Sequence, residues 1–328
     1  MITNDFTEIT IKLGGKCNLA CPHCHCNIPE YEFNPKLLDW IRSQPVYRIK
    51  FGGGEPFLYF DTIRKIVLNL GDAYNYRIVT NGTLLTERNI DFCNDHDITI
   101  VQSYDGESSA RDVSISPKWE LLRFARKCAF SVYTSGSKNS FEIQDDVHNR
   151  IKRYVIKRVS DGGAVFPQFL HETENSSAVE TKESIKEYLK TTAQRVELEL
   201  IGYLQTGDLS DKRALSKAIQ KWLEPKNYKY GVACCNNRHI TVTLDGRFMI
   251  CPYKDEYCGD IEHGINIKYL ESRIPERCRR CSIFKICSNT CILNNTVHEC
   301  MIAKKMYQHL KKLEEKYQIN LVELAPKH

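Results

Sequence analysis

The chain has 328 residues, with 46 Lys and Arg against 41 Asp and Glu, a formal net charge of +5. The basic residues are too few and too scattered to predict a nucleic-acid partner. No apolar run is long enough to cross a membrane, and Met1–Asp5 does not begin a signal peptide. Without an export signal, the 15 cysteines predict metal binding in a reducing cytoplasm rather than a disulfide scaffold.

Short apolar strands alternate with amphipathic helices in the first half of the chain. Strands are expected at Thr7–Leu13, Val46–Phe51, Tyr76–Thr80, Ile98–Ser103, Ala129–Thr134 and Tyr154–Val159. Helices are expected at Asn34–Ser43, Asp61–Leu70, Thr86–Asn94 and Ser116–Lys127. This alternation predicts an α/β fold with a parallel sheet and crossover helices, either open or closed into a barrel.

The middle of the chain is polar and carries weaker signals. Residues Asp161–Glu180, which include His171, are expected to form a surface loop. Helices at Lys182–Thr192 and Asp211–Leu223 are expected to flank a strand near Val196–Tyr203. A second domain is expected to begin at about residue 226.

Three cysteines, Cys17, Cys21 and Cys24, form a C-x3-C-x2-C loop after the first expected strand. Three thiolates can hold three irons of a 4Fe–4S cluster and leave the fourth iron open for chemistry. The alternative is a zinc site, for which His23, His25 or Cys26 is available as a fourth ligand.

Unusual turns follow the next three expected strands. They are Gly52-Gly53-Gly54-Glu55-Pro56, Asn81-Gly82-Thr83 and Tyr104-Asp105-Gly106. Each turn alone is typical of a plain strand-to-helix connection. Together with the cysteine loop they would collect at the carboxyl ends of the strands, the face where α/β barrels bind ligands.

From Thr7 to Thr134 these motifs resemble those of radical S-adenosylmethionine (SAM) enzymes. The resemblance implies that the loop cysteines hold a 4Fe–4S cluster whose open iron is chelated by SAM. It also implies a set of SAM contacts: Gly53, Gly54, Glu55 and Pro56 for the amine, Thr80 and Asn81 for the ribose or sulfonium region, and Ser103 for the carboxylate. Arg111 is a candidate to complete the carboxylate contact. The expected chemistry is release of a 5′-deoxyadenosyl radical that takes a hydrogen atom from an unactivated C–H bond.

Cysteines become dense again in the last third of the chain. His239–Leu244, the turn Asp245-Gly246 and Arg247–Cys251 predict a β-hairpin. Five cysteines then follow in the pattern C-x2-C-x5-C-x3-C and a final Cys: Cys278, Cys281, Cys287, Cys291 and Cys300. Four of them could form a zinc ribbon. A C-terminal helix is expected from Met301 to Tyr317, with its lysines on a solvated face.

After a radical-SAM-like domain, this cysteine order resembles the SPASM domain, an auxiliary iron–sulfur module. The resemblance implies an outer 4Fe–4S cluster on Cys278, Cys281, Cys287 and Cys300. It implies an inner one on Cys235, Cys251 and Cys291, with Cys234 or Cys258 as the fourth ligand or an open iron instead. Three clusters are therefore expected. Cys93 and Cys128 are expected to be core residues, and Cys26 a bystander.

The expected organisation is a partial (β/α)6 radical SAM barrel at 1–225, a SPASM domain at 226–300, and a C-terminal helix and tail at 301–328. Enzymes that resemble this pair of domains mostly modify ribosomally made peptides by crosslinking, epimerisation or backbone excision. The alternatives are a small-molecule oxidase or cofactor-biosynthesis enzyme, a sulfatase-maturase-like side-chain oxidase, and a zinc-stabilised binding module without chemistry. For epimerisation, Cys234 or Cys258 is a candidate hydrogen-atom donor.

The expected partners are a precursor peptide and a reductant such as flavodoxin or ferredoxin. The first strand begins almost at Met1, so no room is expected for an N-terminal leader-recognition domain. Two alternatives are therefore expected for a precursor peptide: a separate recognition protein docks, or the barrel binds the leader directly.

Overall fold

The computed structural model describes residues 6–21, 24, 26–103, 118–122, 124–126, 128–134, 165–169, 182–209, 212–224, 239–252, 255–287 and 297–324. The chain forms two compact units. The first comprises residues 1–179 and 234–270, and the second comprises residues 180–233 and 271–328. This grouping follows strand pairing and helix packing, whereas the expected domain division follows the cysteine motifs.

A mixed ten-stranded sheet forms the first unit, in the order β10-β9-β8-β7-β1-β2-β3-β4-β5-β6. Its parallel part runs in chain order through β1 (Glu8–Lys12), β2 (Arg48–Gly52), β3 (Asn75–Thr80), β4 (Thr99–Ser103), β5 (Cys128–Thr134) and β6 (Val165–Phe169). The first five strands confirm the sequence prediction to within two residues at most boundaries. Parallel order with short crossovers is what alternating strands and helices dictate.

The sixth parallel strand lies at Val165–Phe169. The prediction of a loop over Asp161–Glu180 is therefore wrong at these residues, and the predicted strand Tyr154–Val159 lies outside the described residues. Val and Phe favour a strand, while Pro167 argues against one in the centre of a sheet. In the described sheet β6 is an edge strand, so the missing N–H of Pro167 costs little.

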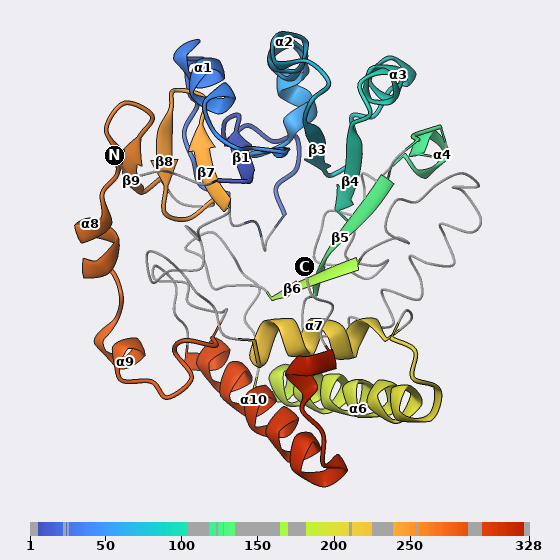
Figure 1. Cartoon of the computed structure of the whole chain (residues 1–328). Coiled ribbons are helices and arrows are strands. Elements are labelled where there is room, and N and C mark those ends of the chain that lie inside the picture. The colour runs from blue at the N-terminus through green and yellow to red at the C-terminus, as the bar shows by residue number, and fades with distance from the viewer. Residues whose placement is uncertain are drawn as a thin grey trace. The chain divides into compact units, whose positions relative to one another are not determined.

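The crossovers are α1 (Lys36–Arg42), the 3₁₀ turn η1 (Pro56–Tyr59) leading into α2 (Phe60–Leu70), α3 (Glu87–Asp95) and α4 (Trp119–Leu122). Of the helix predicted over Ser116–Lys127, the described residues form only α4. Figure 1 shows α1, α2 and α3 on one side of the sheet. Thr86 and Asn89 form a reciprocal capping box at the start of α3.

Alternation along the strands gives the sheet two different faces. Side chains beneath the helices are apolar and fully buried: Ile9, Ile11, Ile49, Phe51, Tyr76, Ile78 and Ile100. The rings of Phe51 and Tyr76 stack there with centroids 6.1 Å apart. The intervening residues put polar and charged side chains on the other face, because successive strand residues point to opposite sides.

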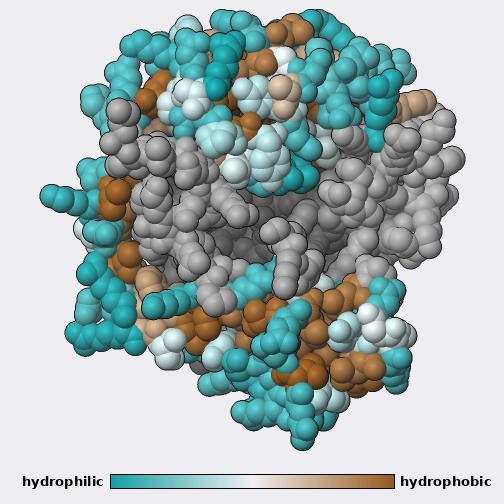
Figure 2. All heavy atoms as spheres, viewed as in Figure 1, coloured by the Kyte–Doolittle hydropathy of each residue, from teal (hydrophilic) through white to brown (hydrophobic). Residues whose placement is uncertain are grey.

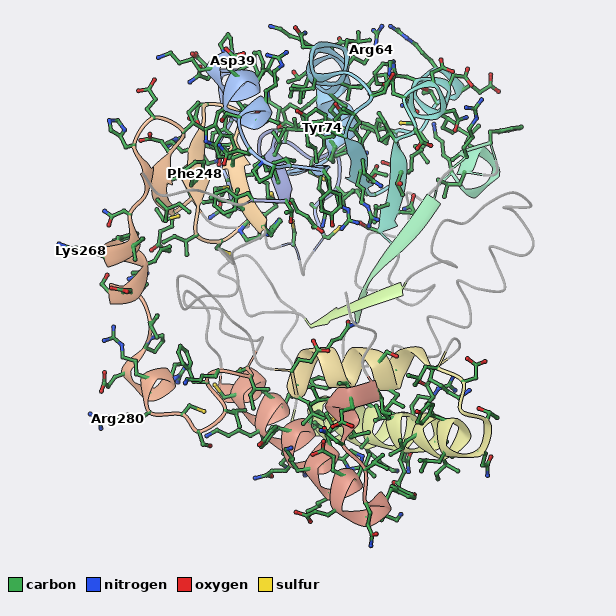
Figure 3. All side chains as sticks on the ribbon, viewed as in Figure 1. Asp39, Arg64, Tyr74, Phe248, Lys268 and Arg280 are labelled. Carbon is green, nitrogen blue, oxygen red and sulfur yellow. The ribbon has the colours of Figure 1, made fainter. Side chains whose placement is uncertain are left out.

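The predicted hairpin is present as β7 (His239–Thr243) and β8 (Arg247–Met249), followed by β9 (Tyr257–Asp260) and β10 (Gly264–Ile265). The sequence did not indicate which strand this hairpin would pair with. β7 pairs in parallel with β1, from Glu8 opposite His239 to Lys12 opposite Thr243. Phe248 of β8, labelled in Figure 3, packs against Trp40 of α1 with ring centroids 5.1 Å apart. The hairpin is therefore part of the first compact unit.

Helices make up the second unit: α6 (Lys182–Thr206), α7 (Arg213–Trp222), α9 (Glu276–Arg279), α10 (Val297–Tyr317) and the 3₁₀ turn η4 (Leu321–Leu324). A further helix, α8 (Ile267–Ser272), spans the boundary between the two units. Figure 2 shows hydrophobic surface gathered on the part formed by α6, α7 and α10. No helix in the described ranges, the 25-residue α6 included, is long and apolar enough to cross a membrane.

The predicted strand Val196–Tyr203 is wrong, because α6 continues through it without interruption. The alternation Val196-Glu197-Leu198-Glu199-Leu200 resembles a half-buried strand. In the helix, Val196 and Leu200 are both fully buried at i, i+4 spacing, while Leu198 is 65% exposed. The Glu199 carboxylate accepts a hydrogen bond from the Leu215 N–H at the start of α7 (2.9 Å), so this polar residue is an inter-helix anchor.

Candidate functional site

The turns that follow β1 and β2 pack backbone to backbone. The Gly54 N–H donates to the Gly14 carbonyl (2.9 Å) and the Glu55 N–H donates to the Lys16 carbonyl (2.8 Å). A Cβ on Gly54 would lie 2.0 Å from the Lys16 oxygen, and one on Gly53 would lie 2.5 Å from the Gly14 oxygen. Only glycine allows this approach, so the Gly-Gly-Glu turn supports the base of the cysteine loop.

Glu30 also holds the backbone at the base of the cysteine loop. Its carboxylate accepts hydrogen bonds from the N–H groups of Gly15 and Lys16 (both 3.0 Å) and from the Tyr59 hydroxyl (2.8 Å). Burial opposes the charge, but these hydrogen bonds and the Lys16 charge keep the pKa of Glu30 below its ordinary value. Sequence reasoning missed both Glu30 and Tyr59, since neither lies in a recognisable motif.

Glu55 joins the turn after β2 to the turn after β3. Its carboxylate is fully buried and accepts hydrogen bonds from the Thr80 hydroxyl (2.7 Å), the Asn81 N–H (2.8 Å) and the Phe57 N–H (3.1 Å). A buried carboxylate needs such donors, because an unsatisfied one would cost several kcal/mol. Three residues that the sequence assigns to SAM contacts, Glu55, Thr80 and Asn81, are therefore in one hydrogen-bonded group.

Asn81 extends this group to the first cysteine. Its side-chain NH₂ donates to the Asn18 oxygen (3.0 Å) and lies 3.8 Å from the Cys17 sulfur. Its side-chain oxygen accepts from the Thr83 N–H (2.9 Å) and hydroxyl (2.7 Å), and the Asn18 NH₂ donates to the Thr83 hydroxyl (2.8 Å). Burial raises the pKa of Cys17, while the Leu19 N–H and Asn81 oppose that rise.

Gln102 of β4 supports the Asn81 turn from the next strand. It is fully buried, and its NH₂ donates to the carbonyls of Asn81 (2.9 Å) and Ser103 (2.8 Å). Gly82 has a positive φ of 76°, and a Cβ there would lie 2.0 Å from the Gln102 oxygen. Ser103, the predicted carboxylate contact, is buried beside Gln102 at the end of β4. A Gln directly after Ile100 and Val101 in a buried strand was the signal that sequence reasoning did not use.

The loop cysteines Cys17, Cys21 and Cys24 form no disulfide, and the Cys24 N–H donates to the Cys21 carbonyl (2.9 Å). Within the described ranges, no group of three His, Cys, Asp or Glu side chains lies close enough to hold one metal ion. Ligands of a cluster bind different irons and so do not converge on one point. Three accessible thiols on a single loop fit this arrangement.

Several predicted residues lie outside the described residues. These are His23, His25, Arg111, Tyr104-Asp105-Gly106, His171, Cys234, Cys235 and Cys291. Cys93 is buried, as predicted for a core residue, and Cys128 begins β5.

Lys12 lies among several cysteines at the end of β1. It is 4% exposed, and burial lowers its pKa against the opposing effects of Cys26, Cys251 and Cys24. Burial raises the pKa of Cys26 to about 11, and the Lys12 charge opposes the rise. Cys251, predicted for the inner auxiliary cluster, is therefore in the same unit as the cysteine loop and also near Lys12.

Cys258 is buried on β9, and its thiol donates to the Phe248 carbonyl (3.6 Å). It lines a cavity of about 560 Å³ together with Tyr257, His263, Asn266 and Tyr269. The structure places Cys258 in the first unit, as it does Cys251. Its two predicted alternatives, fourth ligand and hydrogen-atom donor, both stay predictions.

The outer-cluster cysteines belong to the second unit. Cys278 is buried in α9, and the chain then turns twice, with the Cys281 N–H on the Cys278 carbonyl (3.0 Å) and the Cys287 N–H on the Ile283 carbonyl (2.8 Å). Cys300 lies near the start of α10. None of the four is in a disulfide, which fits the predicted cluster ligands.

Comparisons with known proteins find partial sequence relatives and solved structures with a similar fold. No protein-family model matches the chain. An S-adenosylmethionine-dependent nucleotide dehydratase from a Thermoplasmatales archaeon is 34% identical over 87 residues, 25% of this chain and 32% of that relative. A probable GTP 3′,8-cyclase from Methanosarcina acetivorans is 31% identical over 94 residues, 25% of this chain and 28% of that relative. The matches thus span about a third of these relatives' length.

Solved structures resemble nearly the whole chain. The enzyme anSMEcpe with bound AdoMet and a Cp18Cys peptide matches with a TM-score of 0.60 at 16% identity, over 94% of this chain and 98% of that one. Streptococcus suis SuiB bound to the precursor peptide SuiA matches with a TM-score of 0.60 at 17% identity, over 88% and 72%. These similarities show the fold. The sequence relatives, named as SAM-dependent and GTP 3′,8-cyclase proteins, agree with the predicted resemblance to radical SAM enzymes.

Proposed function

We propose that this chain cleaves SAM reductively and abstracts a hydrogen atom from a ribosomally made peptide, which installs a crosslink, an epimerised residue or a backbone excision. The observation that carries the proposal is the hydrogen-bonded group that joins the cysteine loop, Gly53–Glu55, Thr80–Asn81 and Gln102–Ser103. It gathers motifs from the ends of β1 to β4, as a site at the carboxyl edge of a parallel sheet requires.

In this proposal Cys17, Cys21 and Cys24 hold a 4Fe–4S cluster. When bound, a reduced cluster of this kind supplies the electron that cleaves SAM. The protein's own part is to hold the first ligand in place: Asn81 reaches the Cys17 sulfur, and Glu55 fixes the Asn81 backbone. Because these groups are buried and mutually satisfied, they keep their geometry while a ligand binds.

SAM is proposed to bind along the same edge. Gly53, Gly54, Glu55 and Pro56 would receive its amine, Thr80 and Asn81 its ribose or sulfonium region, and Ser103 its carboxylate. The Glu55 carboxylate already accepts three hydrogen bonds. An ionised carboxylate accepts hydrogen bonds at both oxygens, which suits an ammonium donor.

The auxiliary clusters are also a proposal. Cys278, Cys281, Cys287 and Cys300 would hold the outer cluster, and Cys235, Cys251 and Cys291 with Cys234 or Cys258 the inner one. The division into a partial (β/α)6 barrel at 1–225, a SPASM domain at 226–300 and a C-terminal helix at 301–328 is proposed on the same basis. Cluster assembly requires a reducing compartment, for which we propose the cytoplasm, with flavodoxin or ferredoxin as the reductant.

A peptide substrate is supported by anSMEcpe and SuiB, whose structures were solved with peptides. A separate leader-recognition protein is a proposed partner. A second candidate is a small-molecule enzyme, because two sequence relatives carry names of nucleotide chemistry. Peptides and nucleoside triphosphates are therefore the two substrate classes to compare.

The test is anaerobic reconstitution with iron and sulfide, followed by addition of SAM and dithionite. We expect about twelve irons per chain, as three 4Fe–4S clusters require, and formation of 5′-deoxyadenosine. The matched control replaces Cys17, Cys21 and Cys24 by Ala and should retain about eight irons but form no 5′-deoxyadenosine. Stoichiometric zinc with no 5′-deoxyadenosine would overturn the proposal.

The proposed hydrogen-atom donor needs its own experiment. Cys234→Ala and Cys258→Ala are compared with the parent enzyme after a substrate peptide has been found. If one cysteine is the donor, its Ala variant should still form 5′-deoxyadenosine but lose stereochemical inversion of the peptide. Inversion that is unchanged in both variants would exclude the role.

A further inference from the structure

The polar face of the sheet carries a cluster of cations that the SAM contacts do not use. Lys50 on β2 has two register partners. One is Thr10 on β1, and the other is Arg77 on β3. Lys12 is two residues beyond Thr10, on the same face of β1. Neighbouring parallel strands are about 4.8 Å apart, so these three side chains start from adjacent positions. We name Lys12, Lys50 and Arg77 the basic cluster.

Glu8 is the carboxylate nearest to Lys50 in register, and other groups engage it. Glu8, two residues before Thr10, is in an ion pair with Arg48 and accepts a hydrogen bond from the Tyr47 hydroxyl (3.2 Å). Its charge is therefore matched by a fourth cation on the same face. His239 on β7 adds no negative charge, and burial lowers its pKa to about 4, so it is neutral at pH 7.

Lys50 is the member of the cluster open to a ligand. Its side chain is exposed, whereas Lys12 is buried. Among the described residues its ammonium has no hydrogen bond or ion pair, and Glu8 acts on it only at a distance. Surrounding protein lowers the pKa of Lys50 to about 8, and the charges of Lys12 and Arg77 lower it further. An anion placed there would relieve the repulsion between like charges.

The basic cluster is close to the strand ends that carry the proposed SAM contacts. Lys12 is at the carboxyl end of β1, where it interacts electrostatically with Cys24, Cys26 and Cys251. Gly52, at the end of β2, brings no side chain, and a Cβ there would lie 3.6 Å from the Lys12 ammonium. A group bound at Lys50 is therefore on the same face, about two strand residues below the edge that carries the SAM motifs.

We infer that Lys50, supported by Arg77 and Lys12, binds a side-chain carboxylate of the substrate, so that the peptide modified here is acidic near its reacting residue. The inference rests on the proposed function for the identity of the substrate. Charge-assisted hydrogen bonds between ammonium or guanidinium groups and a carboxylate are about twice as strong as neutral ones. Such a contact would orient the peptide relative to SAM.

The test uses two capped tripeptides, N-acetyl-Gly-Glu-Gly-amide and its Gln counterpart, with GTP as a third probe. Binding to the reconstituted full chain is measured by thermal shift and by tryptophan fluorescence, at constant ionic strength and without SAM or reductant. We expect the Glu peptide to bind at least tenfold more tightly than the Gln peptide. Lys50→Met should abolish the difference.

The matched control is Lys268→Met on α8, an exposed lysine labelled in Figure 3, which should leave the difference unchanged. Lys50→Glu is a second variant that supplies its own carboxylate to the cluster. It should fold stably and show no preference for the Glu peptide. It therefore keeps the test decisive if Lys50→Met folds poorly.

Three results would overturn the inference: equal binding of the Glu and Gln peptides to the parent enzyme, an unchanged preference in Lys50→Met, or GTP binding through Lys50 more tightly than the Glu peptide. The binding measurement needs no SAM cleavage. Failure of the radical chemistry would therefore show separately, as missing 5′-deoxyadenosine with the carboxylate preference intact.

Discussion

The two described cysteine groups are held in position by different means. Cys17 is reached by Asn81, 64 residues further along the chain, and the turn beneath it packs on Gly54. The described backbone N–H groups of Cys278, Cys281 and Cys287 donate to carbonyls no more than four residues away. The first group depends on long-range contacts between strand ends, and the second depends on local turns.

This difference has a physical reason. A cluster that must present an open iron to SAM needs its ligands fixed relative to the residues that bind SAM. Those residues come from other strands, so only tertiary contacts can set the geometry. A fully ligated auxiliary cluster has no such requirement, and the metal itself can order a short loop. The predictions that follow separate the two groups.

The largest effect is expected from removing each set of thiols. Cys17, Cys21 and Cys24 replaced together by Ala should abolish 5′-deoxyadenosine formation. Cys278, Cys281 and Cys287 replaced together by Ala should also remove about four irons per chain but leave SAM cleavage measurable. Iron analysis and chromatography of the nucleoside products check this. If both triple variants lost SAM cleavage equally, the two groups would not be independent.

Gly54→Ala should destabilise the first unit by about 3 kcal/mol, because the new Cβ would lie 2.0 Å from the Lys16 carbonyl oxygen. Gly71→Ala is the control: Gly71 has a positive φ of 77°, and nothing lies within 4 Å of its Cβ position. That change should cost only about 1 kcal/mol. Urea unfolding of the apo proteins measures both. Equal costs would mean that the close approach at Gly54 relaxes freely.

Asn81→Ala should weaken the first group without affecting the second. Loss of the hydrogen bonds from the Thr83 N–H and hydroxyl leaves buried polar groups of Thr83 unsatisfied, at a cost of about 2 kcal/mol. We expect slower SAM cleavage and faster iron loss to a chelator from the first cluster alone. Spectroscopy of each cluster during chelation provides the measurement. Loss of iron at one common rate would contradict the distinction.

Arg279→Ala probes the local contacts of the second group. The Arg279 guanidinium donates to the carbonyls of Glu271 (2.7 Å) and Ile274 (3.3 Å), just before the cysteine turn. The side chain is exposed, so the loss should be about 0.5 kcal/mol. The outer cluster should release iron somewhat faster, and SAM cleavage should be unchanged. Arg280→Ala, next along the chain, is the control because its side chain pairs with the Glu276 carboxylate in α9 rather than with backbone carbonyls before the cysteine turn.

The smallest expected difference is in pH dependence. The surroundings of Lys50 in the first unit lower its pKa to about 8. Below pH 8 the ammonium is charged in the folded state, and this charge destabilises the fold. Its contribution to stability should therefore rise between pH 8 and the ordinary lysine pKa near 10.5. In the second unit, the hydrogen bond from Lys316 lowers the pKa of Glu197, so stability is lost as the pH falls through that pKa. Unfolding of Lys50→Met and Glu197→Gln across pH checks both signs.

Much of the fold was predictable because its signals are local. Strand boundaries in β1 to β5 and the hairpin at Asp245-Gly246 follow from alternation and turn residues. Two predictions were wrong where local patterns were ambiguous: Val196–Tyr203 alternates but is helical, and the strand with Pro167 reads as a loop. In both places tertiary packing decides the structure.

The residues of the candidate site that lie in sequence motifs were predictable. Glycines and cysteines at fixed spacings indicate Cys17 and Gly53–Glu55 directly. The groups that connect them do not form a motif: Glu30, Tyr59 and Gln102 are ordinary residues whose role comes from the partners that the fold brings to them. Such contacts between distant segments leave no pattern in a single sequence.

The parallel pairing of β7 with β1 has a consequence for synthesis of the chain. β1 is a central strand, with β2 on one side and β7 on the other. During translation β2 emerges soon after β1, but β7 begins only at His239. Until then one edge of β1 has no native neighbour, and an open strand edge invites pairing with other chains. The nascent protein therefore depends on protection of this edge until most of its length has left the ribosome.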